Sequence, residues 1–351
     1  MPNPLLWLNS AAFITQKNGS ILIGYGNFQT YPNSKMLDVT KPAFYVTDFF
    51  ISEINPWIQY EESVELSVKD FLVHLKKTSL ESPSWNMQNE EVFSAAFKDL
   101  QKLFDENKLE KAVPYVFTHT CDLMTTSRLL NSIHHGAMLL QSYPGYLYGH
   151  WFNEKGFLGF TPEILFERHS VEPQIIYTMA LAGTKKLEKS HEFIDNKKES
   201  KEHCFVIEGL KETLSPLGEM KIEETRVLNL SKLCHLHTPI QVNLKNHFDY
   251  DLTVKCMHPT PALGAFPREQ GMKWLADYQM KIDREHYGAP FGFHQPSKGD
   301  ALCVVGIRQV QWNSSGMRIG AGCGVIKESI FENEWKEIEL KIASIRNLLG
   351  L

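Results

Sequence analysis

The sequence lacks the short motifs that commonly identify a bound cofactor or an activated nucleophile. It contains no P-loop, no GxSxG elbow, no HExxH and no zinc-type spacing of cysteine and histidine. The six cysteines are scattered without a CxxC pair, which favours reduced thiols over a disulfide framework. No apolar run reaches the roughly 20 residues that a membrane span requires, and no signal peptide is evident. We therefore expect a cytoplasmic protein without a membrane partner.

An excess of basic residues is also absent. The formal net charge is −5, so no broad basic surface is expected for nucleic acid or for an anionic membrane. The hydrophobic content of 43% is that of a globular protein, and 351 residues can bury a large core. No exposed interaction segment argues against a monomer.

The hydrophobic pattern predicts many strands interspersed with a few helices. Strands are expected at residues 11–15, 21–24, 42–50, 112–118, 146–151, 156–161, 164–168, 175–182, 227–230, 240–244, 302–311 and 317–326. Helices are expected at 64–77, 91–108, 197–214 and 330–349, with another after Pro267. Ser329 and Glu332 have the spacing of a capping box at the last helix. This grouping predicts one large α+β domain over residues 1–351.

Two of the predicted helices carry the same pattern of acidic residues. The pattern is Glu199 with Glu202 in one helix and Glu334 with Glu337 in the other. Because the two residues of a pair are spaced i and i+3, both carboxylates project from one side of the helix. The acidic row of each helix lies one position before the apolar row of that helix. Either pair alone would usually be solvated surface. Two such rows facing each other would offer oxygen ligands to a hard divalent cation such as Mg²⁺.

Other residues could take part in chemistry, although each has a simpler explanation. Arg308 lies in an apolar run and needs a partner, either a protein carboxylate or a substrate carboxylate. Lys111 opens another apolar run but could be a solvated cation at a helix end, and Glu163 could be a turn residue. The glycines in 320–324 suit close approach of the backbone to an anionic ligand. The lysines at 197–198 are expected to be solvated.

Taken in order, nine short motifs resemble those of the chorismate-binding enzymes. This family includes anthranilate synthase component I, aminodeoxychorismate synthase component I, isochorismate synthase and salicylate synthase. The motifs are residues 159–165, 180–184, 199–203, 235–238, 258–262, 284–287 with 292, 306–308, 322–324 and 329–341. The resemblance implies a chorismate-binding core at 91–351, with 1–90 as a divergent N-terminal portion of the same fold. It also implies two packed, mainly antiparallel β-sheets flanked by helices, as in anthranilate synthase component I.

The resemblance assigns metal and substrate roles to particular side chains. Glu202 and Glu337 would coordinate Mg²⁺, while Glu199 and Glu334 would bind it through water or hold the first pair in place. The ion would bind the ring carboxylate of chorismate. The other residues implied to bind chorismate are Thr184 and His235 beside the ring, Tyr287 and Arg308 at the enolpyruvyl carboxylate with the backbone of Gly322 and Gly324, and Lys341 at the ring carboxylate.

The reaction that the resemblance implies depends on the nucleophile at ring C2. Members that use water have a lysine where this chain has Lys111, and members that use ammonia usually have glutamine. Ala182 stands where the aminodeoxychorismate enzymes have a lysine, and Glu163 matches the acid that protonates the leaving 4-hydroxyl. The resemblance is closest to isochorismate synthase, an Mg²⁺-dependent hydroxymutase of menaquinone or siderophore biosynthesis.

Other functions are compatible with the same motifs. A salicylate synthase would also eliminate pyruvate in the same pocket. An aminodeoxychorismate or anthranilate synthase component I would use ammonia, and it alone would imply a glutamine amidotransferase subunit as partner. A non-catalytic regulator would bind chorismate or Mg²⁺ without turnover.

Overall fold

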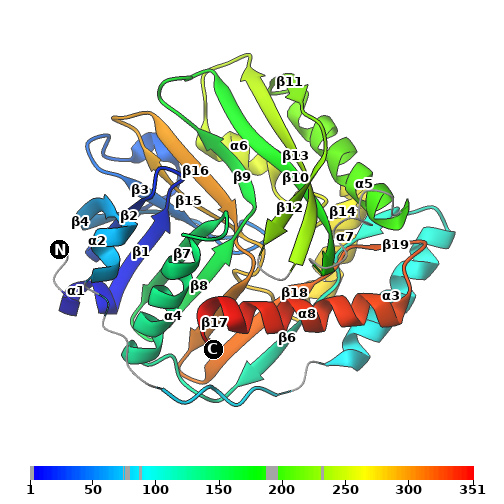
Figure 1. The fold of residues 1–351 in the computed structure, drawn as a ribbon. Helices are drawn as coiled ribbons and strands as arrows, with labels where there is room; N and C mark the ends of the chain where they lie inside the picture. Colours follow the sequence, from blue (N-terminus) through cyan, green and yellow to red (C-terminus); the bar gives the residue numbers. More distant parts are fainter. Residues whose placement is uncertain (1–3, 74, 76–79, 87–88, 187–196, 231–232) are drawn as a thin grey trace.

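The computed structural model describes residues 4–73, 75, 80–86, 89–186, 197–230 and 233–351, and most of its strands belong to one large sheet (Figure 1). The strands are β1 (Ser10–Thr15), β2 (Ser20–Tyr31), β3 (Ala43–Val46), β4 (Trp57–Ser67), β5 (Lys111–Ala112), β6 (Tyr115–Thr120), β7 (Tyr146–Phe152), β8 (Lys155–Thr161), β9 (Ile164–Arg168), β10 (Ile175–Lys186), β11 (Gly218–Ile222), β12 (Arg226–Leu230), β13 (Leu233–Leu244), β14 (Ala265–Phe266), β15 (Pro290–Gln295), β16 (Asp300–Val305), β17 (Gln309–Asn313), β18 (Gly316–Gly322) and β19 (Val325–Ile326). The α-helices are α1 (Pro4–Asn9), α2 (Val68–Val73), α3 (Glu90–Asp105), α4 (Thr126–Leu139), α5 (Lys197–Leu214), α6 (Tyr250–Met257), α7 (Arg268–Gln279) and α8 (Phe331–Leu349), and a short 3₁₀ helix covers Ser34–Met36.

The large sheet has 16 strands within the described residues. Its order is β11-β13-β10-β9-β16-β15-β3-β4-β2-β1-β7-β8-β17-β18-β6, with β12 on β13, and its strand pairs are antiparallel. A small second sheet has the order β14-β5-β19. The α+β class and the mainly antiparallel arrangement are confirmed. The resemblance implied two large sheets, whereas the structure has one continuous sheet. Strands β1 to β4 join the half that ends in β15 to the half that begins with β7.

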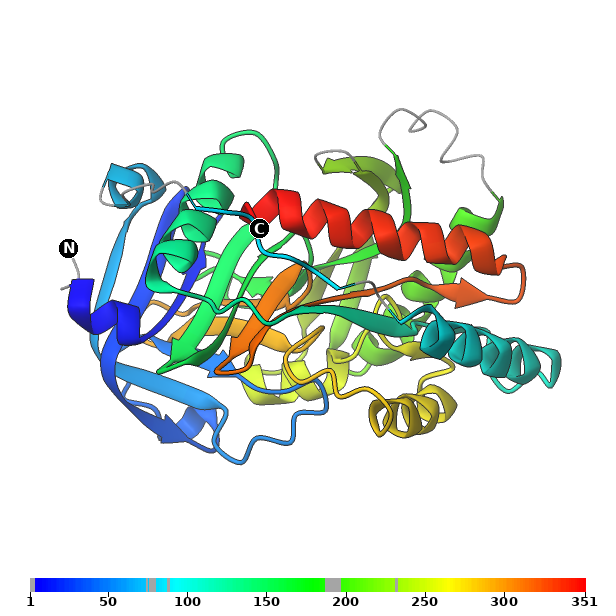
Figure 2. The ribbon, with the colours of Figure 1, turned by 90° about the horizontal axis from the view of Figure 1, so that it is seen from below.

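The helices lie on both sides of the strand layer. Helices α4 and α8 pack against each other, with α4 on β7 and α8 on β8 and β18. Helix α5 packs on β10 and β13 and contacts α6. Figure 2 shows α8 on one side of the strands and α6 and α7 on the other. Within the part of the chain that the structure describes, no helix has both the length and the apolar character needed to cross a membrane.

Separate apolar cores fix α5 and α8 in place. The buried faces are Val206, Leu210 and Leu214 of α5 in one core, and Ile338, Ile342, Ile345 and Leu349 of α8 in the other. Each helix is amphipathic, and its acidic row stands beside this buried face. The core packing therefore turns the acidic row of α5 toward that of α8.

Some local predictions differ from the structure. The helix expected at 64–77 begins only at Val68, because residues 64–67 pair with β2 as the end of β4; residues 74 and 76–77 lie outside the described part. The strand expected at 302–311 is two strands, β16 and β17, separated at 306–308. The capping box is not formed, since Ser329 Oγ accepts from the backbone of Ile326 and the N-cap is Ile330. Helices α1, α4 and α6 lie outside the predicted helices.

Candidate active site

A pocket between α5, α8 and the strands contains most of the predicted site residues. Its lining includes Glu163, Thr184, Glu202, His235, Tyr287, Arg308, Gly322, Gly324, Glu337 and Lys341. Apolar residues complete the wall, among them Val113, Leu181, Leu263, Ile307 and Ile345. The remaining predicted residues, Lys111, Glu199 and Glu334, form ion pairs with Glu202 or Lys198 beside this lining. The structure thus brings together residues that are far apart in the sequence.

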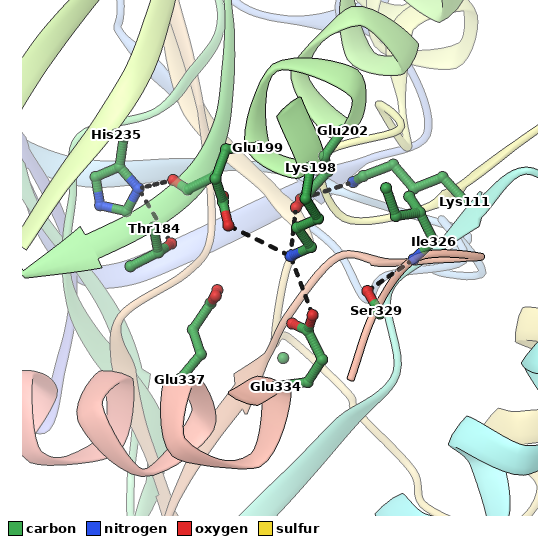
Figure 3. Close-up of polar contacts among 12 residues, drawn as sticks. Lys111, Thr184, Lys198, Glu199, Glu202, His235, Ile326, Ser329, Glu334 and Glu337 are labelled. Carbon is green, nitrogen blue, oxygen red and sulfur yellow. Dashed lines mark hydrogen bonds and ion pairs between the residues drawn. The ribbon is translucent and has the colours of Figure 1, made fainter. Parts of the chain in front are cut away.

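The acidic rows of α5 and α8 face each other across the amino group of Lys198 (Figure 3). Lys198 Nζ lies 3.6 Å from Glu199, 3.3 Å from Glu202 and 3.0 Å from Glu334. The Lys198 side chain is only 21% exposed, so the expectation that it is solvated is wrong. Its sequence position, four residues before Glu202 on the same helix, is the signal that could have placed it here.

Burial and mutual repulsion change the protonation of this cluster. Burial raises the pKa of Glu199 and of Glu334 to about 7, with help from the neighbouring carboxylates and against Lys198. Burial also acts on Glu202, but nearby lysines outweigh it and hold its pKa below the usual value. For Lys198, burial opposes the charge, yet the glutamates outweigh it and raise the pKa. The lysines around the cluster therefore hold the pKa of Glu202 low but do not offset the effect of burial on Glu199 and Glu334.

The donors in the cluster suit a hard divalent cation. They are carboxylate oxygens, which Mg²⁺ prefers, and Lys198 already places a positive charge among them. Within the described residues, no three His, Cys, Asp or Glu side chains are arranged as a metal-binding group. The glutamates surround an ammonium group instead. A divalent cation would have to replace that group as their shared positive partner.

Lys111, at the start of β5, is fully buried. Its Nζ donates to the carbonyl oxygen of Pro261 at 2.6 Å and lies 3.6 Å from Glu202 Oε1. Burial lowers the pKa of the amine; Lys341 and Lys198 lower it further, whereas Glu202 acts in the opposite direction. The alternative of a solvated cation at a helix end is excluded, and a buried amine of this kind can act as a base.

Gly324 allows Lys111 and Glu202 to approach each other. A Cβ atom at position 324 would stand 1.9 Å from Glu202 Oε1 and 3.0 Å from Lys111 Cε. A side chain here would displace one or both groups, because real Cβ contacts are essentially never shorter than 3.0 Å. The backbone at Gly324 therefore makes a close approach to two of the protein's own side chains.

Glu163 lies in the short connection between β8 and β9 and is 4% exposed. Burial raises the pKa of its carboxyl group to about 7, against the opposing charges of Lys111, Lys341 and Arg308. Glu163 therefore lies between two strands, as its sequence position suggested, but its side chain is buried and not solvated. A carboxyl group with this pKa is still partly protonated near neutral pH and can donate a proton.

Arg308 separates β16 from β17 and has a left-handed backbone with φ of 52°, which is strained for a residue other than glycine. Its guanidinium group donates to His235 Nε2 at 2.6 Å, so its partner within the protein is an imidazole and not the protein carboxylate that was one of the two alternatives. Thr184 Oγ1 lies 3.3 Å from Nδ1 of the same ring (Figure 3). Burial lowers the pKa of Arg308 to about 10, so it remains charged at neutral pH.

Tyr287 and Lys341 are held in the pocket wall by further contacts. Lys341 Nζ donates to the carbonyl oxygen of Gly322 at 2.7 Å and lies 2.8 Å from Glu337. Arg284, which the motif analysis assigned no role, donates from Nε to the Tyr287 carbonyl at 2.9 Å, with its guanidinium carbon 5.2 Å from the tyrosine ring centre. Both pocket side chains are therefore fixed before any ligand is bound.

Residues 11–350 match the family model described as chorismate binding enzyme. The chain belongs to the chorismate-binding enzyme family. Among curated members, this chorismate-binding enzyme is 28% identical over 259 residues to isochorismate synthase MenF of Pasteurella multocida, covering 70% of this chain and 56% of that protein. It is 31% identical over 206 residues to the chloroplastic isochorismate synthase of Catharanthus roseus, covering 56% of this chain and 34% of that protein.

The fold of this chorismate-binding enzyme resembles that of a solved family member. The structure of MenF, the menaquinone-specific isochorismate synthase of Escherichia coli, superposes with a TM-score of 0.78 at 20% identity, covering 98% of this chain and 89% of that one. This likeness confirms the expected architecture. The alignments to the two curated relatives span about a third to just over half of their lengths.

Proposed function

We propose that this chorismate-binding enzyme is an Mg²⁺-dependent isochorismate synthase. The observation that carries the proposal is the pair Lys111 and Glu163, two buried groups whose pKa values are shifted in opposite directions. The amine is shifted toward the form that accepts a proton, and the carboxyl group toward the form that donates one. The isochorismate synthases among the relatives support the same reaction.

The substrate in this proposal is chorismate, a dianion, and the pocket offers separate groups to its two carboxylates. Arg308 and Tyr287 would bind the enolpyruvyl carboxylate, and Lys341 the ring carboxylate. Thr184 would border the ring. Ala182 lines the pocket and has no amine, so water is the nucleophile that this site favours.

The acidic rows would hold the metal ion of the proposed enzyme. Glu202 and Glu337 would be its direct ligands, with Glu199 and Glu334 bound through water or supporting them. When bound, Mg²⁺ supplies positive charge against the ring carboxylate. This explains how an acidic cluster can border a site for a dianion.

The two shifted groups divide the proton transfers between them. Lys111 would remove a proton from a water molecule as its oxygen forms a bond to C2. Glu163 would give its proton to the 4-hydroxyl as the C4–O bond breaks, and the ring double bonds shift accordingly. One water enters and one leaves, so the product is an isomer of the substrate, and proton exchange with solvent restores both groups.

Product analysis tests this proposal. Incubation with chorismate and Mg²⁺ is expected to give isochorismate alone, with the same yield whether or not an ammonium salt is present. A chelator is expected to stop the reaction and added Mg²⁺ to restore it. Salicylate with pyruvate, an aminated product, or binding without turnover would each contradict the proposal, and activity in the chelator would contradict its metal component.

Lys198 is expected to compete with the metal ion. In Lys198→Met the acidic cluster loses its shared ammonium group, so the variant should melt at a lower temperature than the wild type in a chelator. Added Mg²⁺ should remove that difference. The variant should also bind Mg²⁺ roughly 10- to 100-fold more tightly than the wild type, because the ion no longer has to displace the charged hydrogen bonds of Lys198. Thermal melts and calorimetric titration with Mg²⁺ measure both effects without relying on activity.

Lys201 provides the matched control for that measurement. It lies on the same helix, with a side chain that is 47% exposed and paired with Glu328. Lys201→Met is expected to leave Mg²⁺ affinity unchanged. Unchanged or weaker Mg²⁺ binding by Lys198→Met would show that Lys198 does not occupy the position of the cation.

A further inference from the structure

His235, on β13, links the bulge of β10 to Arg308. The residue is 6% exposed. Its Nδ1 lies 2.8 Å from the carbonyl oxygen of Gly183 and 3.3 Å from Thr184 Oγ1, while Nε2 lies 2.6 Å from Arg308 Nη2. Gly183 and Thr184 stand where the pairing register of β10 with β13 shifts, and Gly183 has φ of 69°. Both ring nitrogens are thus engaged, one by the bulge of β10 and the other by Arg308 in the connection between β16 and β17.

These partners determine which ring nitrogen carries the proton. A carbonyl oxygen only accepts hydrogen bonds, so Nδ1 of His235 must donate to Gly183. A guanidinium group only donates, so Nε2 must be unprotonated and accept from Arg308. The imidazole is therefore neutral, with its proton on Nδ1. Burial and the charge of Arg308 also lower the pKa of His235 well below its usual value.

A neutral partner leaves the positive charge of Arg308 available. A buried arginine commonly pairs with a carboxylate, which fixes the side chain but also offsets its charge. Here the glutamates of the acidic rows pair with lysines instead. Glu163 is the acid whose charge acts on Arg308, and its own raised pKa keeps it partly neutral.

We infer that His235 is a positioning residue that fixes Arg308 in the pocket without neutralising it, and so reserves the guanidinium charge for a carboxylate of the substrate. The inference rests on the proposed function in one respect, namely that the ligand brings a carboxylate to Arg308. It explains why a histidine suits this position: a carboxylate would hold Arg308 at least as firmly but would occupy the charge that the ligand needs.

The test compares His235→Gln with His235→Glu. Both side chains reach about as far as Nε2 of histidine and accept a hydrogen bond from Arg308, but only glutamate carries a charge. Chorismate binding is measured by calorimetry in a Glu163→Gln background, in which turnover is expected to be slow. The glutamine variant should bind close to the parent, and the glutamate variant roughly 10- to 100-fold more weakly than glutamine. Equal losses in both variants, or undiminished binding by the glutamate variant, would overturn the inference.

His237 provides a control for the mere addition of negative charge. It lies two residues further along β13, is 8% exposed and lines a different cavity. His237→Gln and His237→Glu are expected to bind chorismate equally well. A loss specific to glutamate at both positions would mean that general repulsion, and not the contact with Arg308, weakens binding.

A measurement without ligand separates this inference from the proposed function. Nitrogen-15 NMR of the His235 ring should show a protonated Nδ1 and an unprotonated Nε2 throughout the neutral pH range. An Nε2–H form, or titration near the usual pKa of histidine, would overturn the inference even if chorismate binds. Failure of the proposed function would appear differently, as no chorismate binding by the parent protein although the Nδ1–H form is present.

Discussion

Lys111→Gln is expected to abolish isochorismate formation while leaving chorismate binding nearly intact. Glutamine is polar and only one bond shorter than the lysine that contacts the Pro261 carbonyl at 2.6 Å, but it cannot remove a proton from water. Loss of a general base commonly costs about 10²- to 10⁴-fold in rate, so the change should appear in kcat. Product formation gives kcat, and calorimetric titration with chorismate gives the dissociation constant.

The same substitution at Lys336 is the control, because this lysine lies on the exposed face of α8. Lys336→Gln should retain both activity and binding. Full activity in Lys111→Gln would exclude Lys111 as the base. A loss of chorismate affinity as large as the loss of rate would show that Lys111 acts mainly in binding.

Glu163→Gln is expected to reduce turnover by a similar factor, because glutamine cannot protonate the leaving 4-hydroxyl. Wild-type activity should also decline as the pH rises through about 7, where Glu163 loses the proton that it must donate. The residual activity of the variant should lack this decline. Rate measurements over a pH series with a product assay provide the comparison.

Stability gives an independent test of the same pKa shift. The folded-state pKa of about 7 lies above the ordinary value of 4.5, so the folded protein binds this proton more readily than the unfolded chain. The contribution of this proton to the free energy of unfolding is fully present below pH 4.5 and is lost as the pH rises through 7. Glutamine resembles the neutral acid. Above pH 7 the free energy of unfolding of the variant should therefore exceed that of the wild type by on the order of 3 kcal/mol, at 1.36 kcal/mol per pKa unit.

Glu167 is the matched control for this prediction. It is also buried, on the adjacent strand β9, but it is ion-paired with Lys17. Glu167→Gln should retain activity and lose stability, because it removes one partner of an ion pair. Unfolding curves in denaturant at several pH values distinguish the two variants. A Glu163→Gln protein that is less stable than the wild type above pH 7 would show that the fold stabilises the ionised carboxylate, which contradicts a raised pKa of Glu163.

The features that could be predicted from the sequence are those written in short, regular patterns. Helix α5 begins and ends at the predicted residues, and α8 begins one residue later than expected, because their apolar rows repeat with the helical period. The same periodicity places Glu199 and Glu334 beside the core. The ordered motifs then identify the strands and loops that surround the pocket. These local signals are sufficient for the fold class and for the residues that meet in the site.

The contacts between distant segments could not be predicted in this way. The run 302–311 is apolar enough for a single interior strand, and its pattern does not show that Arg308 adopts a left-handed backbone where the run divides into β16 and β17. The bond from Arg308 to His235 joins residues 73 positions apart. Lys198 has a local partner in Glu202, four residues later on α5, but its contact with Glu334 depends on the position of α8. In each case the partner that decides the role of the residue is supplied by tertiary packing.

The first four strands come early in the chain but lie in the middle of the large sheet. Strand β3 pairs with β15, and β1 pairs with β7. None of the predicted site residues lies in this segment, yet without it β15 and β7 would each present an unpaired edge, and the hydrogen-bonded path between the two halves would be lost. These four strands therefore complete the hydrogen-bonded path that joins the two halves of the sheet. A lost strand in this segment would interrupt that path.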